Sequence, residues 1–132
     1  MLSDREYRAL ARFRHALRVF LRFSEEAARE HGVTPAQHQL LLAIRGHDGL
    51  TAPTVGDMAE ALQQQHHSVV ELVNRAAEAD LVVRTPDPQD RRRQRLALTN
   101  RGESVIEALS TAHRAELRRY RTDLLAALEA LG

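Results

Sequence analysis

Apolar residues recur every three or four positions near both ends of the chain, which predicts a long amphipathic helix at each end. The first helix is expected over residues 4–30, with Gly32 as its stop, and its apolar series is Leu10, Phe13, Leu17, Phe20, Leu21 and Phe23. The last helix is expected over residues 100–130, capped by Thr99, and its series is Ile106, Leu109, His113, Leu117, Tyr120, Leu124, Leu128 and Leu131.

Three shorter helices are predicted between these two. One begins at Thr34, where an N-cap threonine, a proline at the first helical position and Gln37 make a capping-box pattern, and it runs to Gly46. The next begins at Thr54, with Asp57 three residues on. A helix over residues 64–79 follows, and its core face is Val69, Leu72, Val73 and Ala76.

Residues 81–98 predict a β-hairpin, because apolar residues alternate in two short runs on either side of a proline-containing loop. The expected faces are Leu81 and Val83 against Val82 and Arg84, then Leu96 and Leu98 against Arg95 and Ala97. The prolines exclude helix from the loop, so Arg91, Arg92 and Arg93 are expected near the tip of a stiff hairpin. These arginines fit two interpretations, a contact with the minor groove of DNA or a solvated charge run.

Two short helices with a tight connection, followed by a basic hairpin, predict a winged helix-turn-helix. The fold class is therefore mainly α with a small β-hairpin wing and long N- and C-terminal dimerisation helices. The recognition helix would be residues 64–79, and its exposed face offers groups for the major groove: Gln64, His67, Ser68, Val70, Asn74 and Arg75. Glu71, on the same face, either accepts from a cytosine amine or pairs with Arg75 one turn on.

The last helix is expected to project from the rest of the chain. A helix over residues 100–130 is roughly 45 Å long, whereas a globule of this chain length has a radius of gyration of roughly 14 Å. Pairing the terminal helices of two copies would bury the apolar series and set two recognition helices about one DNA turn apart. The alternative is a helical hairpin within one chain. The expected interface residues are Leu10, Phe13, Leu17, Leu109, His113, Leu117, Tyr120, Leu124 and Leu128.

Composition adds a local positive field and excludes several chemistries. Residues 84–101 contain six arginines and two aspartates, a net charge of +4, although the whole chain carries only +1. The chain has no cysteine, which excludes disulfides and thiolate sites. Its seven histidines show no His-x-x-x-His spacing, and it has no phosphate loop or nucleophile motif, so we expect no metal, no cofactor and no enzymatic activity. No apolar run has the length of a membrane span or leader, so we expect a cytoplasmic protein without a membrane partner.

Three segments resemble the multiple-antibiotic-resistance regulator (MarR) family: VTPAQHQLLLAI at residues 33–44, TVGDMAEAL at 54–62 and SVVELVNRAAEADLVVRTPDPQDRRRQRLALTNRG at 68–102. The most specific element is the Asp-x-Arg of the wing, here Asp90 and Arg92. The resemblance implies a dimeric bacterial transcription factor, most often a repressor, that binds a pseudo-palindromic operator and is released by a small ligand.

Carried over by position, the resemblance implies that Arg92 enters the minor groove and that Asp90 orients arginine at the wing. It places His67, Ser68, Asn74 and Arg75 in the major groove. It also implies an effector pocket near the junction of the first two helices, where Phe23, His31 and His38 are candidates for a small aromatic or amphipathic ligand.

The chain departs from the family pattern at three places. Asp80 stands where a glycine usually ends the recognition helix, and Gln63-Gln64 replaces the usual Gly-apolar pair before it. Glu71 occupies a position that is often basic or polar. The start of the recognition helix and the operator sequence therefore do not follow from analogy.

We expect one structural unit with three parts: an N-terminal dimerisation helix (1–32), a DNA-binding domain (33–99) and a C-terminal dimerisation helix (100–132). Its expected function is that of a ligand-responsive repressor, a homodimer bound to double-stranded operator DNA through residues 64–79 and the wing at 84–95. The alternative is a winged-helix protein-interaction module with little or no sequence-specific DNA binding. Glu71 and the small net charge favour the alternative, whereas the arginine tip and the polar recognition face oppose it.

Overall fold

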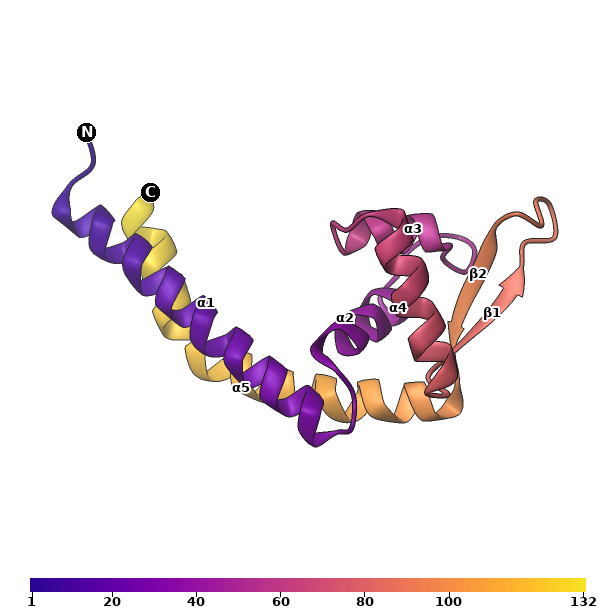
Figure 1. The fold of residues 1–132 in the computed structure, drawn as a ribbon. Coiled ribbons are helices and arrows are strands. Elements are labelled where there is room, and N and C mark those ends of the chain that lie inside the picture. Colours follow the sequence, from indigo (N-terminus) through magenta and orange to yellow (C-terminus); the bar gives the residue numbers. More distant parts are fainter.

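The computed structural model describes residues 1–132 as a body from which a long helical arm projects (Figure 1). The body contains α2 (Pro35–Arg45), α3 (Val55–Ala61), α4 (His66–Glu78) and the strands β1 (Val82–Pro86) and β2 (Gln94–Leu98). The arm is made by α1 (Asp4–Glu30) and most of α5 (Asn100–Leu131), which pack side by side, while the first turns of α5 lie under the body. This is the winged helix-turn-helix with long terminal helices that the sequence predicts.

Hydrogen-bonded caps begin α2 and α3 where the sequence predicts them. Thr34 Oγ1 accepts from the Gln37 amide at 3.0 Å, and the Gln37 side chain accepts from the Thr34 amide at 3.0 Å. Thr54 and Asp57 form the same reciprocal box at 3.1 and 2.9 Å. Each box satisfies two amides that a helix start leaves without a partner. The orientation of α2 and α3 is therefore fixed locally at their first turns.

The hairpin is antiparallel, with Val82 opposite Leu98 and Arg84 opposite Leu96. It is tied to the body by a hydrogen bond from the Leu96 amide to the Pro53 carbonyl at 2.8 Å. The wing thus extends from the end of α4, and this hydrogen bond joins it to the loop before α3 (Figure 1).

The predicted faces of the first strand are wrong. Leu81 and Val82 are both buried, and Val83 is exposed. The cause is the end of α4, where Asp80 takes a left-handed φ of +59° and the Leu81 amide donates to the Ala76 carbonyl at 2.9 Å. Leu81 therefore belongs to the closure of α4, and strand alternation begins only at Val82.

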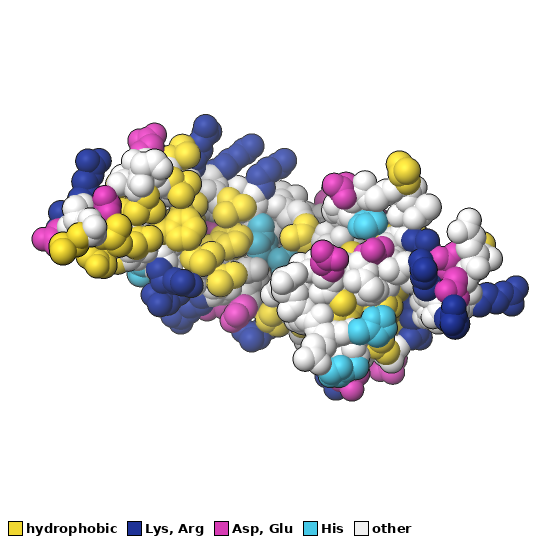
Figure 2. Space-filling model, turned by 90° about the horizontal axis from the view of Figure 1, so that it is seen from above, with side chains coloured by type: hydrophobic (Ala, Val, Ile, Leu, Met, Phe, Trp, Pro, Cys, Tyr) yellow, Lys and Arg dark blue, Asp and Glu magenta, His cyan; other side chains and the backbone are white.

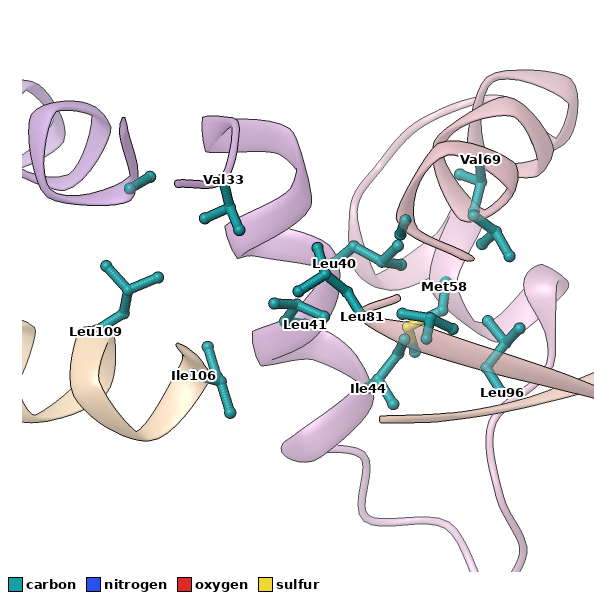
Figure 3. Packing of buried hydrophobic residues seen from close by; sticks show 14 of the residues in the cluster. Val33, Leu40, Leu41, Ile44, Met58, Val69, Leu81, Leu96, Ile106 and Leu109 are labelled. Carbon is teal, nitrogen blue, oxygen red and sulfur yellow. The ribbon is translucent and has the colours of Figure 1, made fainter. Parts of the chain in front are cut away.

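One apolar core joins the body to the base of the arm (Figure 3). Leu40 and Leu41 of α2 lie at its centre, between α4 and the hairpin on one side and α5 on the other. Ile106 and Leu109 of α5 close the core toward the arm. The arm and α4 are consequently held by one continuous set of contacts.

The arm leaves much of its apolar surface uncovered. Figure 2 shows hydrophobic side chains gathered along one face of the arm, with arginines on either side. Exposed members include Leu10, Phe13, Leu117, Leu125 and Leu128. Small residues lie where the helices meet, since Ala9 and Ala127 are buried. The terminal helices thus pair within one chain, as a helical hairpin would, yet this pairing covers only part of the apolar series.

Two residues predicted at the dimer interface are not on this exposed face. Leu109 is fully buried in the core of its own chain, and His113 is 9% exposed. His113 Nδ1 donates to the Leu109 carbonyl at 2.6 Å, and its Nε2 hydrogen-bonds the Ser24 hydroxyl at 2.7 Å. Both residues therefore join α5 to α1 and the body, which corrects their assignment to an interface between copies.

No helix of the structure combines the length and apolarity needed to cross a membrane.

Candidate nucleic-acid interface

Helix α4 turns one face to the core and the other to solvent. Val69, Val73 and Ala76 are fully buried or nearly so. Five of the six predicted major-groove residues lie on the outer part of the helix, where they are exposed or half-buried: His67, Ser68, Val70, Asn74 and Arg75. The sequence therefore predicted the accessible face of α4 correctly, whereas the contact of this face with DNA stays a prediction.

The sixth predicted residue, Gln64, is not on the helix. Helix α4 begins at His66, two residues later than predicted, because Gln63 takes a left-handed φ of +52°. The Gln64 amide then donates back to the Ala59 carbonyl at 3.0 Å and closes α3. Gln64 is exposed in the turn between α3 and α4. It can meet DNA only from this turn.

Glu71 lies on the outer face of α4, where it forms no salt bridge with Arg75. Both residues line a shallow cavity of about 220 Å³ between α4 and the start of α2. The pairing with Arg75 that the sequence allows is thus not formed. The Glu71 carboxylate therefore leaves a negative charge on the outer face of α4.

Arg95 anchors the base of the wing. Its guanidinium donates to Asp87 Oδ2 at 2.9 Å, to the Ala52 carbonyl at 2.6 Å and to Thr51 Oγ1 at 3.1 Å. Asp87 is buried, and its Oδ1 accepts from the Gln89 amide. That hydrogen bond, together with the charge of Arg95, lowers the pKa of Asp87. This network joins β2 and the start of the wing loop to the loop before α3, so the arginine of β2 is structural.

Asp90 organises the wing tip. It accepts from Arg92 Nε at 3.1 Å, from an Arg92 terminal nitrogen at 3.3 Å and from the Arg92 amide at 3.1 Å. Arg93 Nε lies 3.8 Å from Asp90 Oδ2. The hydrogen bonds from Arg92 lower the pKa of Asp90. The Arg92 side chain is nevertheless 91% exposed, so it is oriented without being covered.

The other arginines of the basic stretch differ in their surroundings. Arg91 is exposed at the tip. Arg101 donates to the Ala79 carbonyl and satisfies the end of α4. Arg84, on β1, donates to Asn74 Oδ1 of α4. Two of the six arginines, at positions 95 and 101, therefore hold the fold together, and the positive charge left free for a partner is smaller than the sequence count indicates.

A second cavity, of about 600 Å³, lies where the arm meets the body. Its lining combines apolar side chains with three arginines spaced along α5, and includes Phe20, His38, Leu42, Arg114, Leu117, Arg118 and Arg121. Of the predicted pocket residues, only His38 lines it. Phe23 packs against the ring of His113 at 5.3 Å, and His31 turns its Nδ1 to the Ala27 carbonyl at 2.8 Å. The helical spacing of these arginines beside the apolar series is the sequence signal for this cavity, and the candidates taken from the family resemblance do not include them.

His38 is buried in the wall of this cavity, and its Nδ1 has no hydrogen-bond partner. Its ring lies 4.6 Å from the ring of His113. Burial lowers the pKa of His38 from 6.5 to about 4, and the charge of a protonated His113 acts in the same direction. His38 is therefore neutral at neutral pH and offers an unused polar atom beside the cavity.

The sequence of this chain matches a known protein family. The model of the MarR family matches residues 31–93. The chain is similar to the transcriptional repressor MdtR of Bacillus subtilis, with 30% identity over 72% of this chain and 59% of that protein. The chain thus spans about three-fifths of the length of the curated relatives it matches.

Solved structures share the fold. The MarR family regulator AbsC of Streptomyces coelicolor is 25% identical with a TM-score of 0.76, over 94% of this chain and 83% of AbsC. A DNA complex of MepR from Staphylococcus aureus has a TM-score of 0.74 at 24% identity, over 85% of this chain and 81% of MepR. These relatives are named as regulators or seen with DNA rather than as enzymes, in agreement with the expectation from the sequence.

Proposed function

The chain belongs to the MarR family, and on this basis we propose that it is a homodimeric DNA-binding transcriptional regulator that represses transcription until a small ligand releases it. The observation that carries the proposal is the wing tip, where Asp90 orients an arginine that remains 91% exposed. An oriented, solvated guanidinium at the end of a stiff hairpin suits a narrow minor groove of strong negative potential.

The proposed docking places α4 in the major groove and the wing in the adjacent minor groove. His67, Ser68 and Arg75 of α4 then face base edges or phosphates, and Val70 faces a thymine methyl group. At the wing, Arg92 enters the minor groove with Arg91 and Arg93 beside it. MepR, which has the same fold and was solved in complex with DNA, supports DNA binding by this fold.

A homodimer explains the uncovered face of the arm. Leu10, Leu117 and Leu128 are each more than two-fifths exposed, although they belong to long amphipathic helices. Because contiguous apolar surface of this kind is rare on soluble monomers, we assign it to a second copy, with Phe13, Leu17, Tyr120 and Leu124 along the same helices. The division into dimerisation helices (1–32 and 100–132) and a DNA-binding domain (33–99) belongs to this proposal.

The regulatory part of the proposal rests on the cavity between arm and body. A ligand there would touch Phe20 of α1, His38 of α2 and Arg118 of α5, and would thus contact both parts of the molecule. The apolar lining and the arginine rim favour a small aromatic or amphipathic ligand with an acidic group. The repressor MdtR, to which the chain is similar, supports repression as the direction of regulation.

DNA binding tests the proposal. Fluorescence anisotropy of the purified protein with a duplex from its own upstream region, against a scrambled duplex at two salt concentrations, should give tighter and salt-sensitive binding to the upstream DNA. Aromatic carboxylates, compared with their methyl esters, should then weaken that binding. Absence of binding even at low salt would contradict the proposal and would favour a winged-helix module that binds a protein partner.

A further inference from the structure

A groove of about 720 Å³ separates α4 from the wing. Arg84, Arg92 and Arg93 line it on the wing side, and His66 and Asn74 line it on the α4 side. Its position matters because α4 and the wing tip are proposed to enter neighbouring grooves of DNA. A sugar–phosphate strand runs between any two such grooves, so the space between the two elements must accept that strand.

Arg84 lines this space from the wing. It is exposed on β1, opposite Leu96 in the hairpin register, between the tip and the body. Its guanidinium donates to Asn74 Oδ1, so one end of the group is held against α4. A guanidinium has five N–H donors, and one hydrogen bond to an amide leaves most of them free for phosphate oxygens.

We infer that Arg84 binds a backbone phosphate of DNA in this groove and that Asn74 is its positioning residue rather than a reader of bases. The inference rests on the proposed function and adds two residue roles to it. Arg84 already takes one of the two acceptor positions of the Asn74 oxygen that would accept from an adenine amine, so base reading by Asn74 would compete with this bond. The same hydrogen bond joins α4 to the wing and fixes their orientation relative to each other, so the two elements would meet DNA together.

The acidic residues of the groove are compatible with this placement. Asp57 is engaged in the cap of α3, where its carboxylate accepts from the Thr54 amide at 2.9 Å. That hydrogen bond lowers the pKa of Asp57. Glu60 also lies on the α3 side. Because its charge repels phosphate, the strand should follow the wall formed by α4 and the wing.

A double-mutant cycle tests the inference on a duplex selected from a randomised pool by the wild-type protein. Arg84→Gln should weaken binding about tenfold and lower the slope of the salt dependence by about 0.9, the value for one neutralised phosphate. Asn74→Ala should weaken binding in the wild-type background but have no further effect when Arg84→Gln is present. Arg22→Gln, an exposed arginine of the arm, is the matched control and should change neither quantity.

A neutral phosphate analogue gives a second readout that a merely structural role would not affect. Single methylphosphonate substitutions along the duplex should include one position that weakens wild-type binding and leaves the Arg84→Gln protein unaffected. Equal effects of Asn74→Ala in both backgrounds, or a change of base preference at one position in the Asn74→Ala protein, would overturn the inference. If the wild-type protein selected no DNA, the proposed function itself would fail, and the two failures are therefore distinguishable.

Discussion

In the body, the apolar faces of α2, α4 and the hairpin close on one another, so Leu40, Val69 and Leu96 are at most 1% exposed, whereas in the arm Leu10 and Leu128 remain 44% and 53% exposed. Both regions arise from the same amphipathic pattern. The body buries its apolar faces within one chain because its helices and strands pack against one another from several directions. The two antiparallel helices of the arm can each cover only one side of the other, which leaves one apolar face uncovered, the face that we assign to a second copy.

The largest effect is expected from a substitution on the exposed face of the arm that leaves the body unchanged. Leu128→Asp would place two carboxylates in a symmetric dimer interface and remove two leucine side chains from it. We expect the dimer dissociation constant to rise at least about a thousandfold, measured by sedimentation velocity over a concentration series. Leu50→Asp is the matched control, because Leu50 is a fully exposed leucine of the body. An unchanged dimer in the Leu128→Asp protein would remove the assigned face from the interface.

Acid should weaken the junction between the two regions through His38. Its pKa is lowered from 6.5 to about 4 in the folded chain, so the unfolded chain binds more protons between these values. Stability is therefore fully present above pH 6.5 and falls with pH toward 4, by about 3 kcal/mol at most. Urea unfolding at a fixed protein concentration should show this loss in the wild type and a smaller one in His38→Leu. An identical pH dependence in both proteins would exclude His38 as its source.

A close backbone approach joins the last helix to the body at Gly102. A Cβ at this position would lie 2.2 Å from the Leu81 carbonyl oxygen, so Gly102→Ala must shift the start of α5 against the end of α4. We expect a loss of about 2 kcal/mol in the free energy of unfolding. At Gly56 the added Cβ would meet only Thr54 Oγ1, at 3.6 Å. Gly56→Ala should therefore be neutral or stabilising by up to about 1 kcal/mol, and the opposite order of the two variants would refute this packing.

The smallest expected effect concerns the wing tip alone. Arg92→Ala should weaken binding to all DNA sequences about tenfold and should make the salt dependence shallower. The proposed contact of Arg92 depends on its charge and not on the identity of one base. It should leave the dimer and the unfolding transition unchanged, since its side chain is 91% exposed. Anisotropy titrations at several salt concentrations measure both quantities. Unchanged affinity and salt slope would show that the wing tip does not bind DNA.

Local signals made most of the fold predictable from the sequence. The capping residues at Thr34, Thr54 and Thr99 lie where helices begin, because each cap is a contact between residues three apart. The hairpin followed from prolines and alternation. The face of β1 did not, because it depends on how Asp80 and Leu81 terminate α4 before the strand starts.

The candidate site was predictable only in part, for a related reason. The exposed face of α4 and the Asp90–Arg92 pair are local patterns, and the structure contains both. The Arg84 to Asn74 bond and the Arg95 network join different elements, so their existence depends on tertiary placement. The same holds for the cavity between arm and body, which Phe20 and Arg118 line from two helices of the arm.

The most direct test of a dimer held by the arms joins the two regions in one experiment. Sedimentation of the protein with a labelled operator, selected from a randomised pool, should give two chains per duplex. Insertion of five base pairs at the centre of the operator should abolish tight binding, because it turns one half-site to the opposite side of the helix. One chain per duplex, or equal affinity for both spacings, would contradict a dimer whose arms hold two recognition helices one DNA turn apart.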